Sequence, residues 1–275
     1  MTYVAKINGT YFSLHRQIGR FLYPYYKEGL EFREEMNLAD YFSKPAPYYD
    51  SLSYSFTGLE PEEEHMANME HMFVDIVPDK SLFFNESNSA HHLTYFFANE
   101  AARRLGSAKL LVINFDQHMD FGTPTGRFFC GSWGSRICNS GCDYMVVGCN
   151  RRVTSFKAGE KTGKVYDLTQ LSECITKRHG DCAKIYVTVD MDVLENPASP
   201  KRTNWNPGLI DRDSFIGLLT SLPADKITAA DITGFPPVNT NLPEEALNRL
   251  RPYAEDVRLT AEILCRLMGI APYLD

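Results

Sequence analysis

Acidic and histidine side chains collect at three places in this 275-residue chain, each following a short apolar run. A D-x-H-x-D segment follows the run at 109–115, and a D-x-D segment follows the run at 183–189. His91 and His92 come shortly after a third run, at 81–85. In an extended chain, residues two positions apart point to the same side, so each segment can present its polar groups together. The acidic and histidine residues of the two later segments are Asp116, His118, Asp120, Asp190 and Asp192.

These groups have the chemistry of a centre for divalent metal ions. Crowded carboxylates in one crevice would repel one another and raise their own pKa values unless cations neutralised them. Carboxylate and imidazole ligands without thiolate favour Mn²⁺, Fe²⁺ or Zn²⁺ over a soft metal. Each feature alone has a plainer explanation, since Asp is common in turns and His91 and His92 could simply begin a helix. The conjunction of three such places is what favours a metal centre.

The elements expected around these residues alternate between strand and helix from about residue 70 onward. Short apolar runs rich in β-branched and aromatic residues predict strands, and apolar residues at helical spacing predict helices. The predicted strands are 72–78, 81–85, 109–116, 144–148, 183–190 and 226–234, and the predicted helices are 87–106, 211–222, 244–250 and 254–269. This alternation predicts an α/β fold with a mainly parallel central sheet flanked by helices. In such sheets, sites form at the carboxyl ends of the strands, where the polar segments occur.

Composition narrows the class of protein. A net charge of −7 argues against non-specific binding to nucleic acid or to an anionic membrane. No apolar stretch reaches the ~20 residues of a membrane span, and the first residues lack the pattern of a signal peptide. The seven cysteines are an odd number without paired zinc spacing, which favours free thiols in a reducing compartment. We therefore expect a cytoplasmic protein that binds neither nucleic acid nor membranes.

Three segments, 81–94, 113–122 and 187–200, resemble the metal-binding motifs of the arginase/agmatinase (ureohydrolase) family, in the same order and at similar separation. The resemblance covers about residues 70–270, and residues 1–70 diverge. It implies a single domain over 1–275 with a three-layer arginase-like fold. Residues 20–65 read as an irregular or partly helical surface excursion, a lid or an oligomer contact.

The resemblance also implies a ligand set for two divalent ions, with Mn²⁺ the expected metal. Asp116 and Asp190 would bridge both ions, and each ion would have two further ligands of its own. His91, Asp116, Asp120 and Asp190 would hold one ion, and Asp116, His118, Asp190 and Asp192 would hold the other. The register at the first motif makes His91 the ligand, with His92 as the alternative.

The activity implied by the resemblance is hydrolysis of a linear non-peptide C–N bond by a metal-bridged hydroxide. The substrate would be a small nitrogenous compound: a guanidine, an amidine or an amide. Asp120 would take or relay the proton. A homo-oligomer is consistent with the resemblance, because members of the family often oligomerise.

Three positions depart from the family pattern. Residues 88–90 replace a Gly-Gly-Asp turn, Trp133 stands where the family has a proton-shuttling His, and Gly234 stands where it has a guanidinium-binding Glu. A buried carboxylate is the natural partner of a planar guanidinium. Without it, the substrate is expected to differ from plain arginine.

Neighbouring residues suggest other substrate contacts. Trp133 could stack on a flat or cationic group, and Arg136 or Arg127 could bind a substrate carboxylate. Packing for Trp133 and solvation for the two arginines are the plainer explanations. Two other functions stay open: a catalytically inactive ligand- or partner-binding protein, and a deacetylase-like enzyme.

Overall fold

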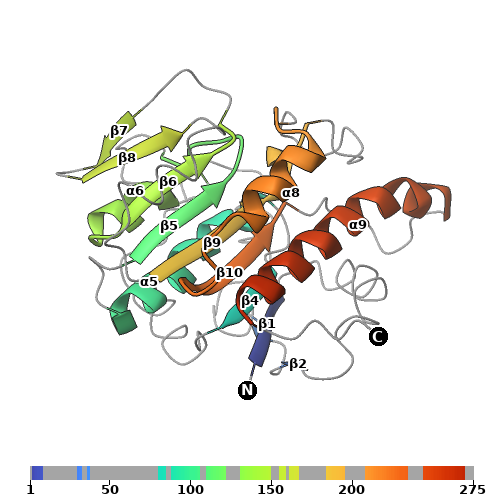
Figure 1. Cartoon of the computed structure of the whole chain (residues 1–275), viewed down its shortest axis with the longest axis horizontal. Coiled ribbons are helices and arrows are strands. Elements are labelled where there is room, and N and C mark those ends of the chain that lie inside the picture. Colours follow the sequence, from blue (N-terminus) through green and yellow to red (C-terminus); the bar gives the residue numbers. More distant parts are fainter. Residues whose placement is uncertain are drawn as a thin grey trace.

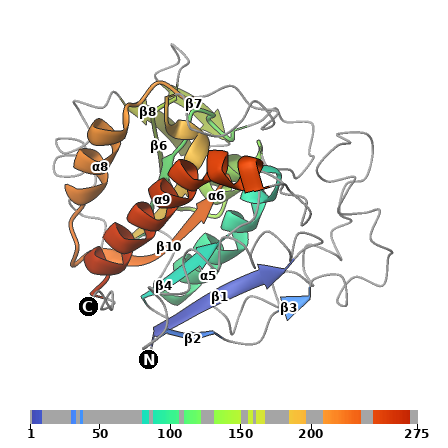
Figure 2. The same ribbon diagram turned by 90° about the vertical axis from the view of Figure 1, so that its right-hand side faces the viewer.

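The computed structural model describes residues 2–8, 30–32, 36–37, 80–84, 88–105, 110–121, 131–149, 155–158, 161–166, 184–195, 208–234 and 244–269. The strands within these ranges are β1 (Thr2–Asn8), β2 (Leu30–Phe32), β3 (Met36–Asn37), β4 (Ser81–Phe84), β5 (Leu110–Phe115), β6 (Asp143–Val147), β7 (Ser155–Ala158), β8 (Lys161–Tyr166), β9 (Lys184–Asp190) and β10 (Ile227–Thr233). They form one sheet in the order β2-β1-β4-β10-β9-β5-β6-β8-β7, and β3 pairs with β1 outside this order (Figures 1 and 2). Only the β7–β8 pair within the described sheet is antiparallel.

Helices cover both faces of this sheet. They are α5 (Thr94–Leu105), α6 (Trp133–Asn139), α8 (Arg212–Thr220) and α9 (Glu244–Leu267), with short 3-10 helices η1 (Asn88–Leu93) and η4 (Met191–Val193). Helices α5 and α6 pack on one face of the sheet through one apolar cluster, and α8 and α9 pack on the other face through a second cluster (Figures 1 and 2). The expected three-layer α/β architecture with a mainly parallel sheet is confirmed.

Strand β5 illustrates why its sequence reads as a nearly continuous apolar run. Leu111, Ile113 and Phe115 lie in the cluster shared with α8 and α9, while Leu110 and Val112 lie in the cluster shared with α5 and α6. Because successive side chains alternate between the two faces, a strand covered by helices on both sides has apolar residues on both of its faces. All of β5 is buried accordingly.

The polar residues of the central strands lie in register. Thr188 of β9 is the Cα partner of Asn114 in β5 on one side and of Asp231 in β10 on the other. Two pairs further along, Asp190 is the partner of Thr233. The face that packs on α5 and α6 is therefore apolar at its start and polar toward the carboxyl ends of the strands.

Most predicted elements are present, with four differences. The two closing helices predicted at 244–250 and 254–269 are one helix, α9, which runs through Pro252. Proline removes one helical hydrogen bond without preventing the chain from continuing as a helix. Helix α6, the β7–β8 hairpin and the strands β1 to β3 had not been predicted.

Two interpretations lie outside the described residues. These are the strand predicted at 72–78 and the role of residues 20–65, of which only β2 and β3 are described. In the described part of the chain, no helix combines the length and the apolar character required to cross a bilayer.

Candidate metal centre

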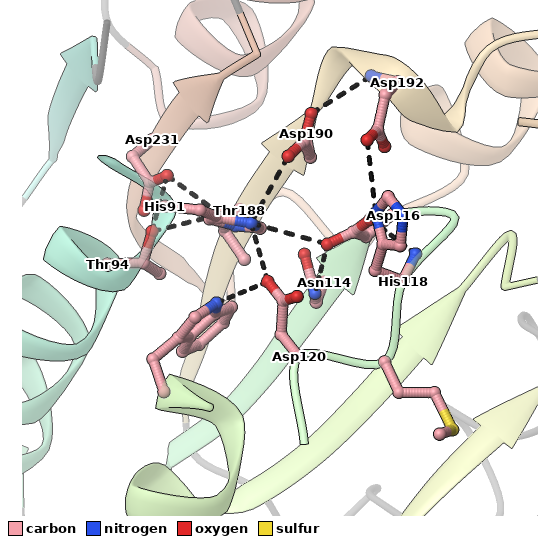
Figure 3. Close-up of polar contacts among 12 residues, drawn as sticks. His91, Thr94, Asn114, Asp116, His118, Asp120, Thr188, Asp190, Asp192 and Asp231 are labelled. Atoms are coloured by element: carbon pink, nitrogen blue, oxygen red, sulfur yellow. Dashed lines mark hydrogen bonds and ion pairs between the residues drawn. The ribbon is translucent and has the colours of Figure 1, made fainter. Parts of the chain in front are cut away.

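Three parallel strand ends bring the candidate ligands to one edge of the sheet. Asp116 follows β5 directly, Asp190 is the last residue of β9, and Asp192 lies in η4 immediately after it. His91 lies in η1, which leads from the end of β4 into α5. Figure 3 shows these side chains, with His118 and Asp120, pointing toward one another. The convergence expected of the three motifs is therefore present in the structure.

One group of side chains surrounds the imidazole of His91. Its Nδ1 lies 2.8 Å from Oδ2 of Asp120, 3.4 Å from Oδ2 of Asp116 and 3.5 Å from Oδ2 of Asp190. His92 is also buried. Because Nδ1 of His91 faces three carboxylates, the geometry favours His91 over His92 as the imidazole of the centre.

A second group surrounds His118. Its Nδ1 lies 3.3 Å from Oδ1 of Asp116 and 3.2 Å from Oδ2 of Asp192. Its backbone amide donates to Oδ1 of Asp116 at 2.6 Å, and the amide of Asp192 donates to Oδ1 of Asp190 at 3.1 Å. The His118 side chain is about one-third exposed (35%), whereas the other five candidate ligands are buried. The centre therefore opens to solvent on the His118 side.

Donor atoms of three residues in each group lie within 4.8 Å of one another. The first set is His91, Asp116 and Asp120, and the second is Asp116, His118 and Asp192. Asp116 belongs to both. Each set could therefore hold a metal ion.

The electrostatics of the centre reflect crowded negative charge. Burial and the charge of Asp116 raise the pKa of Asp120 to about 6 and that of Asp192 to about 7. Burial and the charge of Asp192 hold the pKa of Asp190 well above its usual range. Burial would raise the pKa of Asp116 too, but hydrogen bonds from His118 and His91 hold it well below its usual range.

Burial acts on the pKa values of the two imidazoles in the opposite direction, but the neighbouring carboxylates outweigh it. Burial alone would lower the pKa of His118, but its hydrogen bonds to Asp116 and Asp192 raise it to about 11. Burial would likewise lower the pKa of His91, and the charge of Asp120 raises it well above its usual value. The carboxylates thus favour positive charge at both imidazoles, as they would favour any cation placed between them.

Trp133 lies against this centre and is fully buried. Its indole Nε1 donates to Oδ2 of Asp120 at 2.6 Å, and its ring packs against those of His91 and Tyr144. Trp133 is also the first residue of helix α6. The packing role considered for Trp133 agrees with this burial, and its contact with a substrate stays a prediction.

Arg136 and Arg127 are the other two candidate substrate-binding residues. Arg136 lies one turn after Trp133 in α6 and is partly exposed. Arg127 lies outside the described residues. A substrate contact for either arginine stays a prediction.

Sequence reasoning missed a second layer of polar groups behind the ligands. Asn114 donates to Oδ2 of Asp116 at 3.2 Å, and the hydroxyl of Thr188 lies 3.0 Å from Nε2 of His91. Asp231 lies fully buried behind Thr188. The available signal was an acidic residue inside an otherwise apolar strand, because a carboxylate in that position needs hydrogen-bond donors.

Gly234, expected from the sequence to take the place of the family's Glu, adopts a left-handed backbone with φ of +96°. A Cβ atom there would lie 2.5 Å from Oδ1 of Asp190 and 2.8 Å from the amide nitrogen of Met191. Glycine therefore allows the backbone after β10 to pass close beside Asp190.

Comparison with known proteins agrees with this geometry. The model of the arginase family matches residues 90–245. An uncharacterized protein of Thermotoga maritima is 27% identical over 146 residues, which is 53% of this chain and 54% of that protein. The match thus spans about half the length of that relative.

Solved structures are similar over nearly the whole chain. Formimidoylglutamase from Bacillus subtilis has a TM-score of 0.65 at 14% identity, covering 99% of this chain and 88% of that one. Arginase from Entamoeba histolytica, solved with L-ornithine, has a TM-score of 0.64 at 12% identity, covering 96% and 97%. A hypothetical agmatinase from Burkholderia thailandensis has a TM-score of 0.62 at 14% identity, covering 98% and 87%. With a family match over more than half of its length and an arginase-like fold, the chain belongs to the arginase family.

Proposed function

We propose that this chain is a metal-dependent hydrolase that cleaves a linear, non-peptide C–N bond in a small nitrogenous compound. Two divalent cations, with Mn²⁺ the expected metal, would be held by His91, Asp116, His118, Asp120, Asp190 and Asp192. The observation that carries the proposal is the pair of three-residue donor groups, each within 4.8 Å, that share Asp116.

The donor atoms fit this metal. Each group consists of carboxylate oxygens and one imidazole nitrogen, the ligands that suit Mn²⁺ and similar ions. None of the cysteines that the structure describes belongs to either group. Asp190 adds a further carboxylate oxygen 3.5 Å from Nδ1 of His91, a position consistent with a second bridging ligand.

Bound cations would offset the charge of the carboxylates and lower the pKa of a water molecule toward ~7, which supplies a nucleophile at neutral pH. The chain itself would orient the substrate and move the proton. We assign the proton to Asp120, because a carboxylate of the donor group that would hold the metal can accept a proton from the attacking water and pass it on. Its Oδ2 already takes the hydrogen bond of Trp133, so Oδ1 would carry the proton from the attacking water to the leaving nitrogen.

Gly234 bears on the choice of substrate. With no side chain at this position, the chain offers no carboxylate there to pair with a guanidinium group. The closeness of its backbone to Asp190 also means that a longer residue could not simply be accommodated. An amidine, an amide or a modified guanidine is therefore favoured over plain arginine.

The two alternatives are less well supported. A metal-free binding protein would gain nothing from four clustered carboxylates, whose mutual repulsion destabilises a fold without cations. A deacetylase-like enzyme would need a tyrosine or a histidine pair directed at the substrate. The hydroxyls of Tyr144 and Tyr186 donate instead to the carbonyl of Met119 and to Asp231.

Metal analysis tests the centre. The purified chain, equilibrated with Mn²⁺ and separated from free metal, is expected to retain about two equivalents. Asp116→Asn should retain almost none, because Asp116 belongs to both donor groups. Asp213→Asn, the same change at an exposed position of α8, should behave as wild type. A folded wild-type chain that takes up no metal would contradict the proposal.

Activity tests the substrate class. The Mn²⁺-loaded chain would be incubated with panels of guanidines, amidines and linear amides, and release of urea or ammonia would be measured. Hydrolysis in the amidine or amide panel is expected, and it should disappear with Asp116→Asn. Efficient hydrolysis of arginine or agmatine would contradict the substrate assignment, and inactivity of the loaded chain toward all panels would contradict the hydrolase.

A further inference from the structure

A buried hydrogen-bonded chain lies behind His91, on the side away from the carboxylates. Nε2 of His91 lies 3.0 Å from the hydroxyl of Thr188, which in turn donates to Oδ1 of Asp231 at 2.8 Å (Figure 3). All three side chains are buried. We infer that Thr188 and Asp231 are positioning residues that orient the His91 imidazole and fix its tautomer, so that Nδ1 offers a lone pair to the metal centre. The inference rests on the proposed metal centre.

The direction of the hydrogen bonds carries the argument. Asp231 is surrounded by hydroxyl donors: Thr188 at 2.8 Å, Thr94 at 3.0 Å and Tyr186 at 2.7 Å. Each of these hydroxyls donates to a carboxylate oxygen of Asp231, and a threonine hydroxyl has a single proton to give. Because Thr188 gives its proton to Asp231, its oxygen must accept the hydrogen bond from His91.

The consequence for His91 follows from the two nitrogens of its ring. In a neutral imidazole, one nitrogen carries the proton and the other carries a lone pair. With the proton on Nε2, the lone pair is on Nδ1, which is the atom 2.8 to 3.5 Å from the three carboxylates. Metal-binding histidines commonly have their second nitrogen fixed by such a partner.

The hydrogen-bonded chain of His91, Thr188 and Asp231, called the relay below, is held in place by strand register. Thr188 and Asp231 are Cα partners in the adjacent parallel strands β9 and β10, so their side chains emerge side by side on the face toward α5. Thr94 belongs to α5 and closes the third side of Asp231. Its hydroxyl lies 3.5 Å from that of Thr188 but 3.0 Å from Asp231, so Asp231 is its better acceptor.

Thr188→Val removes the hydroxyl while keeping the branched shape of the side chain. Loss of an outer partner of a metal-binding histidine typically weakens metal affinity about 10–100-fold, and a decrease in this range is expected. Thr188→Ser retains the hydroxyl and should restore affinity to within about threefold of wild type. Asp231→Asn should also weaken binding, because an amide can donate to Thr188 and so reverse the direction of the relay.

Thr94→Val is the matched control. It removes one hydrogen bond to Asp231, as Thr188→Val does, but it leaves the contact between Nε2 of His91 and the hydroxyl of Thr188 in place. Its metal affinity should therefore stay close to wild type. Melting temperatures of all variants without metal would show how much each change affects the fold alone.

Calorimetric titration with Mn²⁺ measures the affinities. In the Zn²⁺-loaded chain, which is diamagnetic, nitrogen-15 NMR of labelled histidine follows the Nε2 proton of His91. That proton should be protected from exchange in wild type and Thr188→Ser, and exchange faster in Thr188→Val. If the wild-type chain binds metal and Thr188→Val binds it equally tightly, the positioning role of Thr188 and Asp231 is overturned but the metal centre is not. A wild-type chain that binds neither metal would overturn the metal centre, and the relay with it.

Discussion

The indole Nε1 of Trp133 donates a hydrogen bond of 2.6 Å to Oδ2 of Asp120, the same oxygen that lies 2.8 Å from Nδ1 of His91. A backbone bond runs beside it, from the amide of Gly134 to the carbonyl of Asp120 at 2.9 Å. Asp120 has a left-handed backbone, with φ of +49°. The start of α6 thus holds in place a residue whose own backbone is unfavourable, with its carboxylate turned into the centre.

Replacing Trp133 by phenylalanine tests this hydrogen bond. Trp133→Phe keeps a buried ring against His91 and Tyr144 but removes the donor to Asp120. Hydrogen bonds to charged groups contribute roughly 1.5–3 kcal/mol, so the free energy of unfolding should fall by about that amount. Mn²⁺ affinity should fall as well, because Asp120 is no longer held. Denaturant unfolding and metal titration check both, and wild-type values in both would contradict this account.

The two donor groups should be separable by mutation. Asp192 belongs only to the group with His118, and Asp120 only to the group with His91. Asp192→Asn and Asp120→Asn should therefore each lose about one of the two metal equivalents, in contrast to the shared Asp116. Metal analysis after gel filtration gives the ratio. Loss of both equivalents from both single variants would show that the groups do not bind independently.

Gly234 and Gly217 provide a matched pair of glycine substitutions. Gly234→Ala would place a Cβ 2.5 Å from Oδ1 of Asp190 at a φ of +96°, and strain of this kind costs about 1–3 kcal/mol. It should also weaken metal binding by displacing Asp190. Gly217 is exposed in α8, and a Cβ there would meet nothing within 4 Å. Gly217→Ala should raise stability by up to about 1 kcal/mol. Thermal unfolding of both variants measures the contrast, and equal effects would contradict it.

Cys265 should be unreactive in the native chain. Burial and the charge of Glu262 raise the pKa of its thiol to about 12, so the thiol stays protonated at pH values up to about 9, where a free cysteine is largely thiolate. Alkylation followed by peptide mass spectrometry should modify Cys265 only after unfolding. Cys149, which is partly exposed, serves as the reference. Labelling of native Cys265 at the rate of Cys149 would contradict this burial.

The sequence predicted the layered α/β fold because burial on both faces leaves a direct trace. Strands such as β5 and β9 are apolar at nearly every position, and α5 and α8 have clear helical spacing. The sequences of β7 and β8 have no comparable apolar run. Helix α9 takes the place of two predicted helices, and it continues through Pro252 although proline removes a helical hydrogen bond.

What the sequence determined by itself was the set of candidate ligands: D-x-H-x-D and D-x-D are local patterns, and a strand period of two already turns their side chains the same way. Only the tertiary structure decided that Nδ1 of His91 faces three of those carboxylates, that Trp133 donates to Asp120, and that Thr188 and Asp231 stand behind His91. These contacts join residues from 13 to 99 positions apart. They depend on which strands are neighbours and in which register, and packing sets both.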